Sequence, residues 1–155
     1  MGIKKVIANK EVPAVVFAEK SLARTIEEAA FSYHVMHIDC SAVVDKESLL
    51  ALLAAELSFP EYFGQNWDAL ADCLSDMPDW LDPADDGYVL LFTNAEQISI
   101  DGVNLDAFLE KGQFFFPDIN SPEYAAFLTF FKVLEDASKT LLELRGIVIK
   151  AIFLF

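Results

Sequence analysis

The residues with the clearest chemical meaning are three aspartates spaced four positions apart: Asp68, Asp72 and Asp76. At about 100° per residue, a helix places positions i, i+4 and i+8 on one ridge. The apolar residues of the same segment fall on the opposite side, as a stripe predicted to be buried: Trp67, Leu70, Leu74 and Met77. A row of carboxylates with no Lys or Arg within helix reach attracts cations, so the segment is a candidate surface for a cationic partner.

Other interpretations of these residues are a solvated acidic face and an enzyme that uses two of the carboxylates. A glycosidase needs two carboxyl groups on opposite sides of a sugar. Asp68 and Asp72 lie on adjacent turns of one predicted helix and do not provide opposed faces. The sequence also has no Gly-rich phosphate loop and no Ser-His-Asp arrangement, so we predict a protein that is not an enzyme.

The histidines and cysteines give little support for a metal site or a cofactor. His34 and His37 are three apart in a predicted strand and therefore point to opposite faces. Neither Cys40 nor Cys73 belongs to a C-x-x-C pair, and an acidic neighbourhood raises the pKa of Cys73. We therefore expect no metal, no cofactor and two buried free thiols, as is typical of a reducing cytoplasm.

Charge is distributed unevenly along the 155 residues, which carry 25 acidic and 11 basic side chains for a formal net charge of −14. Residues 47–110 contain 14 acids and no Lys or Arg, so the whole net charge arises in this segment. Such a charge argues against nucleic acid and anionic membrane as partners and favours a basic protein. The N-terminus lacks the apolar run of a signal peptide, and no apolar stretch is long enough to span a bilayer, so we expect a cytoplasmic protein.

The secondary structure that must position these residues alternates between strands and helices. Strands are predicted at residues 12–17, 34–40, 88–92 and 147–155, and helices at 21–30, 45–56, 66–77 and 121–144. Ser21 is predicted to cap its helix, and either Asp45 or Ser48 to begin the next one. Strands that are apolar on both faces and alternate with helices indicate an α/β fold with a mostly parallel sheet of three to four strands.

Residues 94–120 have no clear assignment. They include the run Phe114-Phe115-Phe116, which is either core, a cover for the sheet edge, or a patch for weak self-association.

The run F-P-E-Y-F-G-Q-N-W-D-A-L-A-D-C-L at residues 59–74 resembles the barstar family of ribonuclease inhibitors. The resemblance extends over roughly residues 34–155, with the same order of strands and helices. Residues 1–33 form an additional N-terminal strand and helix, so residues 1–155 are expected to form a single barstar-like domain.

The resemblance implies an inhibitor of a basic, secreted, barnase-type ribonuclease, acting as an antitoxin or immunity protein. The helix after the glycine loop would plug the nuclease active site. Its contacts would come from six residues: Tyr62, packing beside the site, Gly64 and Asn66, at the helix start, Asp68, facing flanking donors, Asp72, at the phosphate-binding centre, and Asp76, completing the ridge. The alternative is a non-catalytic interaction module of the same fold that binds a different basic protein.

Two further points follow from the same resemblance. Either Glu135 or Asp136 is expected to add an acidic contact from the last helix. Ala71 and Met77 stand where barstar itself has tryptophan, so the helix is expected to offer a partner less aromatic contact.

Overall fold

The computed structural model describes residues 3–10, 14–106 and 125–155. The α-helices are α1 (Ile3–Ala8), α2 (Ala23–Ala29), α3 (Lys46–Glu56), α4 (Trp67–Asp76) and α6 (Ala125–Arg145). The strands are β1 (Val15–Ala18), β2 (Tyr33–Asp39), β3 (Gly87–Thr93), β4 (Ser99–Ile100), β5 (Val103–Asn104) and β6 (Val148–Leu154). The chain also forms short 3₁₀ turns, which are η1 (Lys20–Leu22), η2 (Met77–Asp79) and η3 (Ala95–Gln97).

Four of the strands form one parallel sheet in the order β1-β6-β3-β2, which confirms the predicted α/β fold. The two central strands, β3 and β6, are buried along almost their whole length. The largely apolar sequences of β3 and β6 reflect this position, because a parallel sheet is covered by helices on both faces. The exception is Lys150 of β6, which is buried and donates from Nζ to the carbonyl of Asn9 at 3.0 Å. Strands β4 and β5 pair antiparallel in a separate two-stranded ribbon.

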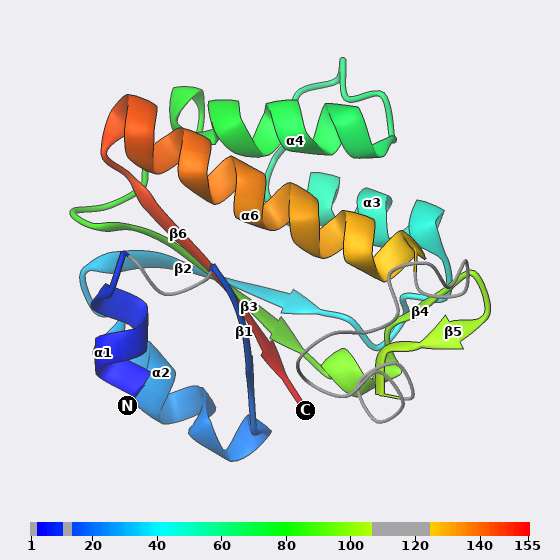
Figure 1. Cartoon of the computed structure of the whole chain (residues 1–155), viewed down its shortest axis with the longest axis horizontal. Helices are drawn as coiled ribbons and strands as arrows, with labels where there is room; N and C mark the ends of the chain where they lie inside the picture. Colours follow the sequence, from blue (N-terminus) through cyan, green and yellow to red (C-terminus); the bar gives the residue numbers. More distant parts are fainter. Residues whose placement is uncertain (1–2, 11–13, 107–124) are drawn as a thin grey trace.

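Helices cover both faces of the main sheet (Figure 1). On one face, α3, α4 and α6 enclose the larger core, in which Phe92 of β3, Phe153 of β6 and Phe130 of α6 pack together. On the other face, α1 and α2 enclose a second apolar cluster: Ile7, Ile26, Ala30, Val89, Leu91, Ile152 and Leu154. The N-terminal segment therefore supplies a layer that the sheet would otherwise lack.

Two local expectations are corrected by the structure. Ser21 does not cap a helix, because residues 20–22 form the turn η1 and α2 begins at Ala23 without a side-chain cap. The backbone N–H of Lys20 donates to the carbonyl of Phe155, which ties this turn to the end of β6. The helix α1 was not expected, because six residues are too few to show a helical period.

Other boundaries agree or lie outside the described residues. Strand β1 starts at Val15, whereas the predicted start near Pro13 falls outside the described part of the chain. The predicted helix start at Ser121 and the run Phe114-Phe115-Phe116 also lie outside it. Both residues named for the start of α3 are used, since Asp45 Oδ1 accepts from the Ser48 N–H (2.7 Å) and Ser48 Oγ accepts from the Asp45 N–H (3.1 Å).

Candidate partner-binding surface

Helix α4 is positioned at its start by the loop that precedes it. Asn66 is the N-cap, with its Oδ1 accepting a hydrogen bond from the backbone N–H of Ala69 at 2.7 Å. The other end of the same amide, Nδ2, donates to the carbonyl of Gly64 at 3.3 Å. A Cβ at Gly64 would lie 3.2 Å from that nitrogen, so a larger residue would crowd the cap. Asn66 and Gly64 therefore fix where the helix begins.

The apolar stripe of α4 is buried as predicted, mainly against α6. Leu70, Leu74 and Met77 have no exposed surface. Trp67 is partly buried and stacks on Phe130 of α6, with ring centroids 5.9 Å apart. Burial of about four apolar side chains stabilises the docked helix by several kcal/mol, which is ample to hold α4 in one orientation.

The opposite side of α4 carries Asp68, Asp72 and Asp76, which are all exposed; we call these three carboxylates the acidic ridge. Among the described residues, none of the three forms an ion pair. Like charges four residues apart repel by a few tenths of a kcal/mol per pair. The free protein therefore keeps a small repulsion that a cationic ligand would relieve.

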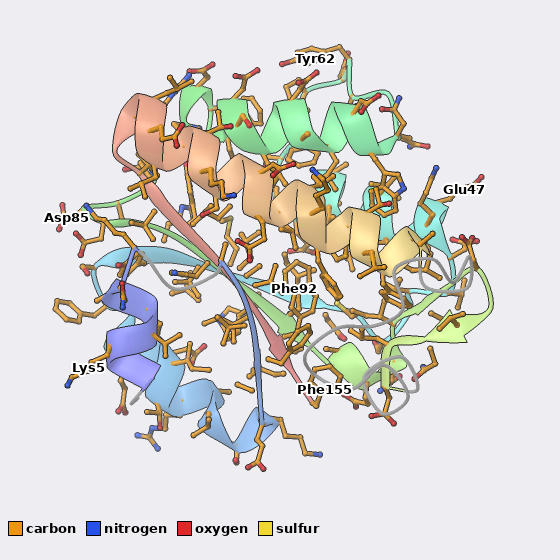
Figure 2. The ribbon with its side chains drawn as sticks, in the orientation of Figure 1. Lys5, Glu47, Tyr62, Asp85, Phe92 and Phe155 are labelled. Carbon is orange, nitrogen blue, oxygen red and sulfur yellow. The ribbon has the colours of Figure 1, made fainter. Side chains whose placement is uncertain are left out.

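Tyr62 stands beside the ridge, on the loop that leads into α4 (Figure 2). Its side chain is 73 % exposed, the largest aromatic surface near the helix. Desolvation, followed by the charges of Cys73, Asp76, Asp79 and Asp72, raises the pKa of its hydroxyl. Tyr62 thus remains a protonated hydrogen-bond donor at neutral pH, in the electrostatic field of the ridge.

Two cations near α4 come from outside the acidic segment and were not anticipated from the sequence. Arg145, the last residue of α6, donates from Nη1 to Asp79 Oδ1 at 2.9 Å. Lys46, at the start of α3, places Nζ 5.7 Å from the centre of the Trp67 ring. Neither contact could be foreseen, because each joins elements far apart in the chain.

The two neighbouring acids of α6, Glu135 and Asp136, have different surroundings. Glu135 accepts backbone hydrogen bonds from Ala14 (3.1 Å) and Val15 (2.8 Å), so its carboxylate holds the start of β1. Asp136 is exposed and pairs with Lys132 at 3.2 Å. The Glu135 carboxylate is therefore engaged within the fold rather than presented to a partner.

Both histidines have partners within the fold. His34 contacts the carbonyl of Asp82 (2.7 Å) and His37 pairs with Glu27 (2.8 Å), on opposite faces of β2 as predicted. Within the described residues, no group of three or more His, Cys, Asp or Glu side chains is arranged to hold a metal ion.

Both cysteines are buried free thiols, as expected. Burial raises the pKa of Cys40 to about 12 and also raises that of Cys73. Neither thiol is therefore available as a nucleophile near neutral pH.

An open cavity of about 490 Å³ lies where the N-terminal ends of α3 and α6 approach Trp67. Its charged lining consists of Asp45, Lys46, Glu47 and Asp101. Asp45 caps α3, and the hydrogen bonds from the backbone and side chain of Ser48 lower the pKa of its carboxyl, which does not suit a general acid. The cavity adds negative charge near the start of α4 but offers no arrangement typical of catalysis.

The described helices do not include one that is long and apolar enough to cross a membrane. The sheet and the ridge define an acidic α/β protein that presents at its surface a helix whose three outer carboxylates form no ion pair with any residue that the structure describes. A family model described as Barstar (barnase inhibitor) matches residues 33–110, half of the chain. The chain belongs to the barstar family, and the match contains both the ridge and its preceding loop. A search of curated proteins finds no match.

Proposed function

We propose that the protein inhibits a basic, secreted, barnase-type ribonuclease by inserting α4 into the nuclease active site. The observation that carries the proposal is the acidic ridge: three exposed carboxylates that no described residue pairs with, in the segment that matches the barstar family. A ribonuclease must direct fixed cationic donors at a phosphate and at its transition state. Carboxylates held on a rigid helix can occupy those donors in place of the substrate.

The six expected contact residues have distinct tasks in this proposal. Asp72, at the middle of the ridge, occupies the phosphate-binding centre, and charge-assisted bonds from Arg fix its register. Asp68 and Asp76 face the flanking donors. The ring of Tyr62 packs beside the active site, while Gly64 and Asn66 allow the close approach of backbone at the start of α4.

The proposed setting is the cytoplasm of the cell that makes the nuclease, where the inhibitor acts as an antitoxin or immunity protein. This role requires binding and no catalysis, in agreement with the expectation drawn from the sequence. We also propose that residues 1–33 belong to the same domain, because α1 and α2 share a buried cluster with β3 and β6.

The test is a titration of a barnase-type ribonuclease with the protein, following RNA cleavage at low and at physiological salt. We expect stoichiometric inhibition by the wild type. The Asp72→Ala variant should bind at least about 30-fold more weakly, because removing a central interfacial charge typically costs 2 kcal/mol or more. Glu28→Ala is the matched control, since it removes an exposed acid of α2, on the other face of the sheet, and should leave inhibition within about twofold.

One observation favours a second candidate, an interaction module for a different basic protein. Met77 has no exposed surface and Ala71 is small, so α4 offers a partner little apolar contact beyond Tyr62. If the wild type fails to inhibit at either salt concentration, the inhibitor proposal is wrong. Capture of another basic protein that is lost in Asp72→Ala would then support the second candidate.

A further inference from the structure

We propose that Arg145 is a specificity-determining residue that closes the acidic ridge at its C-terminal end and so sets where a cationic partner docks on α4. The inference rests on the proposed function of the acidic ridge. It adds the residue that determines at which position along α4 the partner binds. It concerns a guanidinium that lies outside the segment matched by the family model.

The geometry places Arg145 where the row of carboxylates would otherwise continue. Asp79 follows Asp76 by three residues, in the turn η2 that directly extends α4. The Arg145 guanidinium binds this carboxylate at 2.9 Å. Beyond it, three more exposed acids continue the negative surface: Asp82, Asp85 and Asp86. Without Arg145, acidic side chains would run without interruption from the start of α4 to the start of β3.

The charge of Arg145 is permanent, since a guanidinium does not lose its proton in proteins. The hydrogen bond that Arg145 donates to Asp79 raises the pKa of the guanidinium further, and the charges of Asp79, Asp76 and the nearby Tyr88 add to this effect. A partner cation that approaches Asp79 must displace a group held on the same chain and is repelled by it. Asp68 and Asp72 lie farther along the helix and keep their full attraction.

A purely stabilising role accounts poorly for this pair. Its side chains are 36 % and 59 % exposed, and ion pairs at such exposure contribute little to the stability of the fold. The positive charge of Arg145 would stabilise the C-terminal end of α6 through the helix dipole even if Arg145 did not contact Asp79. The effect on the electrostatic field of the ridge is therefore the larger consequence of the contact.

The experiment maps the binding of a hexa-arginine peptide by amide NMR shifts on the intact protein. In the wild type, shifts should be confined to residues 66–77. In Arg145→Gln they should extend over residues 79–86, with an affinity about threefold higher, as expected for one exposed charge pair. Arg145→Lys keeps the charge and should retain the wild-type map.

Lys132→Gln is the matched control. It also removes one positive charge from α6 and frees one aspartate, Asp136, from an exposed ion pair. Its map over residues 66–86 should equal that of the wild type. Wild-type shifts that already cover residues 79–86, or identical maps for the wild type and Arg145→Gln, would overturn the inference.

The nuclease titration separates this inference from the proposed function. A wild type that does not inhibit the nuclease contradicts the proposed function, whereas the peptide map still decides the role of Arg145. If the wild type does inhibit the nuclease, Asp76→Ala should weaken binding to the nuclease more in the Arg145→Gln background than in the wild-type background. Equal losses in both backgrounds would contradict the role of Arg145.

Discussion

Asn66 shows how a single side chain positions the proposed binding residues. Its Oδ1 closes the first turn of α4, in which Asp68 lies. We expect Asn66→Ala to lower the free energy of unfolding by about 1 kcal/mol, because it removes the N-cap acceptor. Asn66→Ser retains a capping oxygen and should recover most of this loss. Urea denaturation checks both variants, and equal stability of Asn66→Ala and the wild type would contradict the role of the cap.

The buried thiol of Cys40 predicts how stability changes at alkaline pH. Burial, assisted by Asp39 and Glu96, raises its pKa from 9.0 to about 12. Because the pKa is higher in the folded state, the contribution of Cys40 is complete below pH 9 and is lost as the pH rises toward 12. Tyr88, whose pKa burial raises from 10.0 to about 12, adds to the loss over the upper part of this range.

The check is the free energy of unfolding of the wild type and Cys40→Ala between pH 8 and 11. The wild type should lose stability above pH 9, and Cys40→Ala should lose less over the same interval because one of the titrating groups is gone. Parallel pH profiles for the two proteins would show that Cys40 is not responsible.

At the scale of elements, Glu135 connects α6 to the N-terminal strand. One carboxylate accepts the N–H groups of Ala14 and Val15, where β1 joins β6 at the edge of the sheet. Glu135→Gln leaves only one acceptor oxygen in that position. We expect a loss of about 1–3 kcal/mol, as for a half-buried backbone donor left without a partner.

Hydrogen exchange locates this effect. The amides of residues 14–18 should exchange faster in Glu135→Gln, whereas those of the central strands β3 and β6 should change little. Asp136→Asn alters the neighbouring, exposed acid and serves as the control, with no change expected in β1. Uniform acceleration in every strand would instead show that β1 is not a separately opening element.

Elements with a strong local pattern could be predicted from the sequence. The stripe of α4 and the Asn66 start were visible because a helix with one buried face repeats its apolar residues every three to four positions. Strands β3 and β6 were visible because burial on both faces favours a run of apolar residues, which Lys150 alone interrupts in β6. Helix α1 and the turn η1 were not predictable, because packing on the sheet and the Lys20–Phe155 hydrogen bond fix them.

The same distinction separates the residues of the candidate site. The exposure of Asp68, Asp72 and Asp76 followed from helical spacing alone. The Arg145–Asp79 contact joins residues 66 positions apart, and a single sequence does not show which distant elements meet. The choice between Glu135 and Asp136 likewise depended on where β1 lies, which only the assembled sheet reveals.

For the whole molecule, the location of the charge matters more than its amount. Residues 47–110 hold 14 of the 25 acids and none of the 11 basic residues, and most of them fold into α3, α4 and β3 with their connections. The N-terminal segment, by contrast, carries its acids together with bases, as in the Arg24–Glu28 pair. This distribution would steer a basic partner toward one side of the protein, and such steering acts on the rate of association.

Two triple variants with the same net charge test this steering. Asp68→Asn, Asp72→Asn and Asp76→Asn together reduce the net charge from −14 to −11, and so do Glu19→Gln, Glu27→Gln and Glu28→Gln. At low salt, the association rate with a barnase-type ribonuclease should fall at least about tenfold for the ridge variant, since focused fields raise such rates by factors of 10 to 1,000. The N-terminal variant should fall by no more than about threefold, because its acids are remote from the docking helix and partly paired with bases. Stopped-flow measurements over a range of salt concentrations should also show a weaker salt dependence for the ridge variant alone. Equal losses of rate in both variants would mean that total charge, rather than the field around α4, guides the encounter.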